Sequence, residues 1–437
     1  MTEKIKFENL SGFGAKFTSS PQTAPAALCL NFKAEGDRLT DGFSLSNAFF
    51  GEGNKIMQLP DNVRKGRLFA SLTAAGEMIM LASGGKIYIA DPEDPESGFE
   101  DSGITYSGEV CFANVGANGG VNTAIADESG KITFYDGYSF FDISLEYGVV
   151  AVKELYGRLV AVTDSAVLIS AAGDPSDFST LAGGYSLDLG NAFHAKSAAA
   201  FGNEIVVAGR RGLCRVARSE FGNSFTLRPI FTDGERLLPE TVAAGADGVY
   251  IFSERGLARY NGADVTFINP ETGVYATEGI CGFIFGGEYH ACVKAAENAQ
   301  KRYVLSFGSK CRLADTPLES VAASADGTRY YALSGALGKI CMLGGASVFP
   351  SASRRFKTAE TDFGVQGRKT LSSFSLYSAK DVRLFLTVDG KRRLYRLVGG
   401  SGRRTIRPHA SGEVFSFEIV ADGNGASIGG IQAEIEY

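Results

Sequence analysis

Residues that could do chemistry are sparse in this chain of 437 residues. It has three histidines, His194, His290 and His409, and no two of them have the spacing of a metal-ligand pair. This excludes a histidine-rich metal centre, while a calcium site made only of oxygen ligands stays open. No nucleophile elbow, P-loop or dinucleotide-binding fingerprint occurs. The nearest glycine cluster, residues 423–430, lies between two expected strands and is typical of a turn.

Carboxylates could do chemistry in a propeller glycosidase, which needs convergent acids and often an arginine cluster. Residues 127–134 (DESGKITF) and 324–328 (SADGT) only faintly resemble the S-x-D-x-G-x-T-W hairpin of sialidases, and the chain has no tryptophan. Two acidic, proline-containing loops, 91–99 and 173–178, are expected to be structural turns, with calcium coordination or a partner contact as the alternative. We therefore expect no catalytic residues, no bound cofactor and no enzymatic activity.

The cysteines give no redox or metal motif. Their number is odd, they are widely scattered, and they never form C-x-x-C; they are Cys29, Cys111, Cys214, Cys281, Cys292, Cys311 and Cys341. This pattern favours buried free thiols over a disulfide scaffold or a zinc site. The N-terminus lacks the apolar region of a secretion signal, and no apolar run is long enough for a membrane helix. We expect a protein made and folded in a reducing cytoplasm without export or membrane insertion.

One segment has a charge of its own. Between Arg354 and Arg407 there are 14 Lys or Arg against 4 Asp or Glu, whereas the whole chain has a net charge of −6, so the remainder sums to about −16. Such asymmetry marks a surface with its own partner. The candidate partner-binding residues are Arg354, Arg355, Lys391, Arg392, Arg393, Arg403 and Arg404.

Two interpretations of these basic residues compete. They are either solvated hairpin residues or a docking surface for an acidic neighbour, which would be a protein subunit or a nucleic-acid backbone. Aromatic residues are not interleaved with them as a base-stacking platform requires, so nucleic acid is the weaker option.

The elements that must position these residues are strands. A hairpin that begins with a glycine turn recurs seven times, with glycines near positions 76, 120, 157, 202, 248, 287 and 327. A unit of about forty residues with four short strands is the size of one propeller blade. The sequence therefore predicts an all-β protein with a six- or seven-bladed β-propeller over residues 61–349.

The flanking segments differ from this repeat. Residues 1–60 fit it poorly and are expected to supply an outer strand that closes the ring, or else a disordered arm up to about Pro25. Residues 350–437 alternate apolar and polar side chains, and Asp389-Gly390 is a type I′ turn signal. We expect a small antiparallel β-sandwich there.

Two stretches carry a resemblance to a known group of proteins. Residues 158–178 (RLVAVTDSAVLISAAGDPSDF) resemble a strand followed by a G-D-P-x-D-aromatic turn in virion proteins of tailed bacteriophages, and residues 353–356 (SRRF) and 429–435 (GGIQAEI) resemble the start and end of their C-terminal β domain. The resemblance implies a structural component of the tail or head–tail junction, present in several copies around a symmetric tube. Other virion proteins would be its partners. The alternative is a propeller adhesin that binds a host-surface glycan, and a propeller glycosidase is a more remote one.

Overall fold

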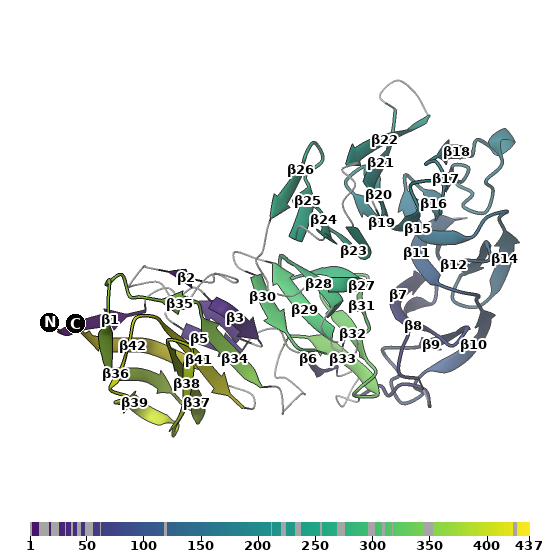
Figure 1. The fold of residues 1–437 in the computed structure, drawn as a ribbon. Coiled ribbons are helices and arrows are strands. Elements are labelled where there is room, and N and C mark those ends of the chain that lie inside the picture. Colours follow the sequence, from purple (N-terminus) through teal and green to yellow (C-terminus); the bar gives the residue numbers. More distant parts are fainter. Residues whose placement is uncertain are drawn as a thin grey trace.

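A computed structural model gives the fold of the chain (Figure 1). It describes residues 2–7, 17–18, 26–30, 32–35, 38–41, 45–48, 56–61, 63–117, 120–210, 212–219, 224–231, 237–253, 256–268, 276–295, 302–307, 311–316, 318–344, 353–422 and 426–437. Strands dominate these residues, and within them no helix is long and apolar enough to cross a membrane.

Seven groups of four antiparallel strands are arranged around a ring, with the first strand of each nearest the centre (Figure 1). The first three blades are β7 (Arg67–Thr73), β8 (Gly76–Ser83), β9 (Lys86–Ala90) and β10 (Glu100–Thr105); β11 (Val110–Ala117), β12 (Gly120–Asp127), β13 (Lys131–Tyr135) and β14 (Phe140–Ser144); and β15 (Val149–Leu155), β16 (Arg158–Thr163), β17 (Ala166–Ile169) and β18 (Tyr185–Asp188). The fourth and fifth are β19 (Ala195–Phe201), β20 (Glu204–Gly209), β21 (Gly212–Arg218) and β22 (Phe225–Phe231); and β23 (Leu237–Gly245), β24 (Gly248–Ser253), β25 (Gly256–Tyr260) and β26 (Val265–Ile268). The sixth and seventh are β27 (Ala276–Phe285), β28 (Glu288–Ala295), β29 (Arg302–Phe307) and β30 (Cys311–Ala314); and β31 (Ser320–Ala323), β32 (Tyr330–Ser334), β33 (Lys339–Leu343) and β6 (Leu45–Asn47).

The repeated glycine marks the same place in every blade. Each of the seven glycines lies at the turn between the first and second strands or begins the second strand. Gly202 and Gly327, for example, have φ of 55° and 69°, a left-handed conformation that favours glycine. The predicted propeller is confirmed, and its seven hairpins become the second and third strands of seven blades.

Hydrophobic clusters hold neighbouring blades together. Val160 of the third blade and Ile205 of the fourth belong to one such cluster, and Ile79 of the first blade and Tyr331 of the seventh belong to another. A middle strand is therefore buried on both faces, which explains why β20 is a continuous apolar run from Ile205 to Ala208.

The N-terminal segment closes the ring. Strand β6 pairs with β33 through Leu45↔Leu343, Ser46↔Met342 and Asn47↔Cys341 and is the outer strand of the seventh blade. The outer strand of the last blade thus comes from the N-terminal part of the chain. Its pairing with β33 joins residues that are far apart in the sequence and leaves β33 without a free edge.

Two further sheets lie beside the propeller and combine both ends of the chain. Their C-terminal strands are β34 (Arg354–Thr358), β35 (Glu360–Thr361), β36 (Lys369–Ser378), β37 (Val382–Val388), β38 (Lys391–Leu397), β39 (Gly400–Ile406), β40 (Ala410–Gly412), β41 (Phe415–Ala421) and β42 (Ile428–Glu436). Their N-terminal strands are β1 (Thr2–Lys6), β2 (Phe17–Thr18), β3 (Ala26–Leu30), β4 (Phe32–Glu35) and β5 (Arg38–Asp41). We call these strands together the C-terminal domain.

One hydrophobic core fills the space between these two sheets. The first sheet has the order β39-β36-β42-β5-β4, with β1 also paired to β42 and β40 to β36. The second contains β2, β35, β41, β34 and β3, with β37 and β38 continuing from β41. Phe374 of the first sheet stacks on Phe417 of the second, with ring centroids 4.5 Å apart. Asp389 and Gly390 join β37 to β38 with φ of 45° and 77°, as a type I′ turn requires.

Strand β3 connects the propeller to the C-terminal domain. It pairs in parallel with β30 of the sixth blade at Leu30↔Leu313, and antiparallel with β34 from Ala26↔Thr358 to Leu30↔Arg355. The sixth blade and the second sheet are therefore one continuous hydrogen-bonded sheet. Strands β1 to β5 thus contribute to the C-terminal domain, which the sequence predicts over 350–437 alone.

Replacing Leu45 should weaken ring closure. Leu45 is fully buried on β6 in the cluster between the sixth and seventh blades. We expect Leu45→Ala to lower the free energy of unfolding by about 2–5 kcal/mol, because it leaves a cavity at the closing strand. Urea unfolding measures this, with Ser46→Ala on the same strand as the control. Equal effects of the two substitutions would show that β6 does not hold the ring.

His290 should make the stability depend on pH. It is buried on β28, with Nδ1 2.7 Å from Ser306 Oγ and Nε2 3.2 Å from the Phe285 carbonyl oxygen. Burial lowers the pKa of His290 from 6.5 to about 4. Between these two values the unfolded chain binds a proton that the folded chain does not, so the free energy of unfolding falls as the pH falls.

The contribution of His290 can be isolated by substitution. Between about pH 7 and about pH 5 the loss attributable to this side chain is about 2 kcal/mol. His290→Gln should remove that part of the pH dependence, because glutamine does not titrate. Chemical unfolding of both proteins at the two pH values measures the difference. Parallel pH profiles for the two proteins would contradict the assignment.

Candidate functional site

The outer surface of the second C-terminal sheet carries a basic cluster built around Glu418. Alternate residues of β37 face opposite sides: Leu384 and Leu386 are buried in the core, whereas Phe385 and Thr387 face outward. Glu418 of β41 lies directly opposite Phe385, so it shares the outward face. We call this surface the basic face.

Glu418 accepts hydrogen bonds from two arginines on neighbouring strands. Its Oε1 accepts from Arg355 Nε at 2.8 Å, and its Oε2 accepts from Arg392 Nη2 at 2.5 Å. The Glu418 side chain is only 7% exposed, whereas those of Arg355 and Arg392 are 42% and 50% exposed. Arg392 also stacks on Phe385, with Cζ 3.8 Å from the ring centroid. Two guanidinium groups are therefore fixed side by side at the surface, and one carboxylate compensates only part of their charge.

Further basic and apolar side chains extend this face toward β38. Arg383 binds both carboxylate oxygens of Asp422 at 2.8 Å. Leu394 and Arg396 of β38 are exposed and belong to the same face, because they lie opposite Phe385 and Arg383. Among the described strands, β38 pairs only with β37 and is therefore an edge.

Charged residues on an edge strand have a second interpretation. Lys391 and Arg393 are exposed on β38, on the side opposite the basic face. Natural sheets use such charges to prevent edge-to-edge association, so these two also fit solvated edge residues.

The seven residues named from the sequence do not form one surface. Arg354 points to the core side of β34, opposite Ala421, and is 3% exposed. Successive strand residues face opposite sides, so Arg355 can lie on the surface only if Arg354 does not. The expectation that both belong to a docking surface is wrong for Arg354.

Arg403 and Arg404 lie on the other sheet, on β39. Arg403 is opposite Tyr377, with Cζ 4.8 Å from the tyrosine ring centroid. Arg404 is opposite Leu376, and its Nη2 donates to the Gly399 carbonyl oxygen at 3.1 Å. The seven residues are thus divided between two sheets of one domain, and Arg404 lies on the core side of β39 whereas Arg403 lies on its outward side.

Four residues of the basic face were missed from the sequence: Arg383, Phe385, Arg396 and Glu418. Glu418 could have been suspected, because it is a lone charge in the apolar strand FSFEIVA. Its two arginine partners are 63 and 26 residues away, so sequence spacing gives no sign of them.

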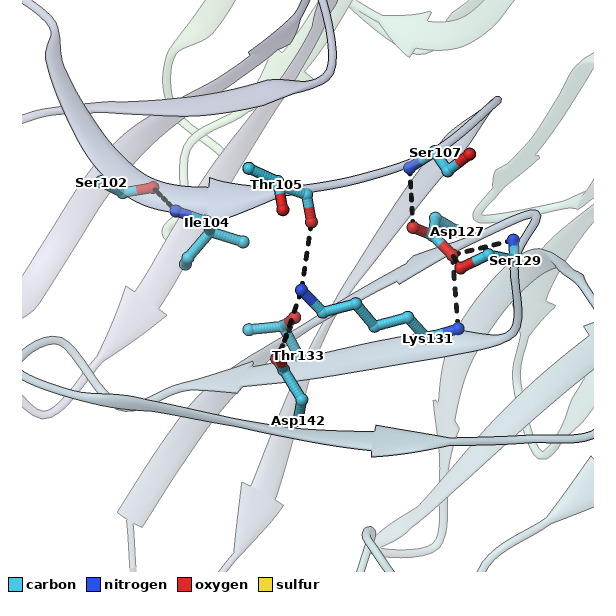
Figure 2. A network of polar contacts seen from close by, with 9 residues as sticks. All are labelled: Ser102, Ile104, Thr105, Ser107, Asp127, Ser129, Lys131, Thr133 and Asp142. Atoms are coloured by element: carbon cyan, nitrogen blue, oxygen red, sulfur yellow. Dashed lines mark hydrogen bonds and ion pairs between the residues drawn. The ribbon is translucent and has the colours of Figure 1, made fainter.

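In the propeller, the acidic residues singled out from the sequence serve turns. Figure 2 shows Asp127, which is buried and accepts from the backbone N–H groups of Ser107, Ser129 and Lys131 at 2.8, 2.9 and 3.3 Å. Lys131 extends to the Thr105 carbonyl oxygen at 3.2 Å and to Asp142 at 3.1 Å (Figure 2). This network joins the first blade to the second.

The acidic loops make similar local contacts. Asp91 Oδ1 accepts from Glu93 N–H at 2.8 Å, and Asp174 Oδ1 accepts from Ser176 N–H at 3.0 Å. Asp326, between β31 and β32, accepts from Ser324 and Thr328, and these hydrogen bonds lower its pKa to about 2. Across the described residues, no cluster of His, Cys, Asp and Glu could hold a metal ion.

The described cysteines are free thiols: Cys111, Cys214, Cys281, Cys292 and Cys341. Burial raises the pKa of Cys111, Cys214 and Cys341 to about 11. These three therefore stay protonated near neutral pH, which is unfavourable for a nucleophile.

Exposed aromatic side chains gather at the outer edge of the second blade. Tyr138, Phe140, Phe141 and Tyr147 are all exposed, and Phe141 stacks on Phe134 with ring centroids 5.1 Å apart. Strand β14 pairs only with β13 among the described strands, so this patch sits on a free sheet edge. It is a second candidate contact surface.

No protein-family model and no curated protein matches this chain. Similar solved structures include BBS1N in complex with ARL6DN, at 12% identity and a TM-score of 0.45, covering 69% of this chain and 96% of that one. BamB from Moraxella catarrhalis matches at 11% identity and a TM-score of 0.41, covering 66% and 95%. A chain of the mitotic checkpoint complex matches at 12% and 0.46, covering 67% and 94%. These are β-propeller proteins; the seven blades here rest on the chain's own strand pairing.

Removing the Glu418 carboxylate should destabilise the C-terminal domain. In Glu418→Gln the side-chain amide nitrogen takes the place of one carboxylate oxygen and cannot accept a hydrogen bond from an arginine. We therefore expect the free energy of unfolding to fall by about 2 kcal/mol. Chemical unfolding measures the loss, and Glu360→Gln at an exposed position is the control. A change no larger than that of the control would show that the two arginines do not depend on Glu418.

Proposed function

We propose that this protein is a non-enzymatic structural component of a tailed-phage virion, in the tail or at the head–tail junction. In this proposal the propeller is the scaffold, and the basic face docks the protein to an acidic surface of its neighbours. The virion part of the proposal comes from the sequence resemblance in residues 158–178, 353–356 and 429–435.

The observation that carries the structural role is the strand pairing through β3. Strand β30 of the sixth blade pairs with β3 at one residue pair, Leu30↔Leu313, and β3 continues through β34 to β41, where Glu418 lies. The basic face and the propeller are therefore connected by paired strands. Such a connection suits a part that must keep its orientation in an assembly.

The charge distribution supports a protein partner and assembly from several copies. Residues 61–349 sum to −11, so the propeller of one copy is itself an acidic surface for the basic face of another. Such head-to-tail contacts build a closed ring when the rotation that relates one copy to the next divides a full turn. This agrees with a homo-oligomer around a symmetric tube.

The absence of enzymatic activity is also part of the proposal. The candidate acids of the propeller, Asp127 and Asp326, are engaged by their own turns, and the pKa of Cys111, Cys214 and Cys341 is raised by burial. Groups used in this way are poor candidates for general acid–base or nucleophilic catalysis.

Charge reversal on the basic face tests the docking role. Arg383→Glu with Arg396→Glu changes two arginines of the basic face that are not used to hold Glu418, so the fold should be retained. We expect incorporation into purified particles to fall at least roughly tenfold, since each reversed charge opposes an acidic partner. Quantitative mass spectrometry and negative-stain imaging of particles from a lysate measure incorporation.

The matched control reverses two exposed basic residues of the propeller, Arg64→Glu with Lys65→Glu. It should be incorporated like the wild-type protein. Normal incorporation of the Arg383/Arg396 variant would show that the basic face does not dock the protein. A wild-type protein that never appears on particles would overturn the virion proposal itself.

The aromatic edge of the second blade favours one alternative, a glycan-binding propeller. Exposed Tyr and Phe rings can pack on sugar faces, and Tyr138 is 79% exposed. In that case the wild-type protein would bind a glycan array, and Tyr138→Ala would lose this binding while Tyr437→Ala, an exposed tyrosine in the C-terminal domain, would keep it.

A further inference from the structure

A hollow of about 670 Å³ lies on the outer surface of the first C-terminal sheet, away from the basic face. Its lining residues come from β1, β5, β36, β39 and β42 and the segments next to them: Lys6, Arg38, Tyr377, Ser378, Ala379, Gly400, Ser401, Arg403, Ser427, Gly429 and Gly430. Three of these residues are basic, and no Asp or Glu is among the described residues that line the hollow. We call it the cationic hollow.

Strand register explains why the cations converge there. Arg38 of β5 lies opposite Gly429 of β42, Gly429 lies opposite Tyr377 of β36, and Tyr377 lies opposite Arg403 of β39. Directly opposed residues in an antiparallel sheet point to the same face. Arg38, Tyr377 and Arg403 therefore form one row across four strands, with a missing side chain at Gly429.

The two glycines keep this row open. Gly429 leaves the sheet surface bare between Arg38 and Tyr377. At Gly430, with φ of 57°, an added Cβ would come within 2.8 and 3.0 Å of the Tyr377 ring. Any larger residue at position 430 would displace that ring, so this glycine allows Tyr377 to lie against the backbone.

Arg403 is held in place before any ligand binds. Its guanidinium group stacks on Tyr377 at 4.8 Å, and its Nη1 donates to Gln432 Oε1. A guanidinium group has five N–H donors, so these contacts leave donors that a ligand oxygen can use. A fixed arginine loses little side-chain freedom on binding, which favours affinity.

Lys6 adds a third positive charge from the first strand of the chain. Strands β1 and β5 pair with the same edge of β42, and Lys6 lies opposite Gln432, the acceptor of Arg403. The next carboxylate along the outward face of β42, Glu434, accepts from Ser373 Oγ at 2.9 Å. Among the described residues that line it, the cationic hollow thus has three basic side chains and no carboxylate.

We propose that the cationic hollow binds a phosphate or sulfate group carried by a small organic molecule. Guanidinium groups match the oxygens of a tetrahedral oxyanion, and Ser401 and Ser427 at the rim add hydroxyl donors. The volume falls within the range of about 300–1,000 Å³ that is usual for small-molecule sites, which leaves room beyond the oxyanion itself. This site is independent of the proposed docking role of the basic face.

Calorimetric titration of the full chain tests the proposal, with inorganic phosphate, inorganic sulfate and glucose 6-phosphate as probes. We expect saturable binding, tighter for the sugar phosphate if the organic group fills the rest of the hollow. Equal affinity for phosphate and glucose 6-phosphate would also support the oxyanion site and would identify the free ion as sufficient. Absence of saturable binding by all three probes would overturn the proposal.

Substitutions locate the binding. Arg38→Gln with Arg403→Gln should weaken it about tenfold or more, because hydrogen bonds to charged groups are lost. Ser427→Asp, at an exposed position of the lining, should weaken binding to a similar extent, because the new carboxylate repels the oxyanion while Arg403 is left unchanged. Arg383→Gln on the basic face is the control and should bind like the wild-type protein. If the Arg38/Arg403 and Ser427 variants bind as tightly as the control, the cationic hollow is not the site.

Discussion

Strand pairing between the two ends of the chain is the constraint on which this structure depends. A propeller blade exposes a free edge until its last strand is supplied, and here β6 supplies it from the N-terminal side. Before reaching the ring, the same segment forms β1 beside β42, so the two termini lie side by side (Figure 1). The ring, the C-terminal domain and the joint between them are therefore completed by one stretch of chain.

Both proposed contact surfaces follow from this arrangement. The basic face lies on the sheet that β3 connects to the sixth blade, which relates its orientation to the propeller through backbone hydrogen bonds. The cationic hollow depends on β1 and β5, which bring Lys6 and Arg38 beside residues that are 426 and 391 positions later in the chain. An isolated C-terminal fragment would lack Lys6 and Arg38 and therefore two of the three basic side chains of the cationic hollow.

Much of the fold could be predicted because it is locally encoded. The seven glycine turns and the apolar runs after them are short-range patterns, and each hairpin pairs neighbours in sequence. The type I′ turn at Asp389-Gly390 was predicted for the same reason. The candidate site was predicted less well: a count of basic residues indicated the right segment, but it cannot separate Arg354, which faces the core, from Arg355, which faces solvent.

By itself, the sequence determined the class of fold, the size of the repeat and the place where the charge changes sign, because these depend on the order of residues along the chain. Only the tertiary structure decided which arginines share a surface, which carboxylate holds them, and where the N-terminal strands go. The physical reason is that these features depend on pairing between strands far apart in the sequence. The row from Arg38 to Arg403 is an example: strand register places these residues side by side, and their spacing in the sequence does not indicate it.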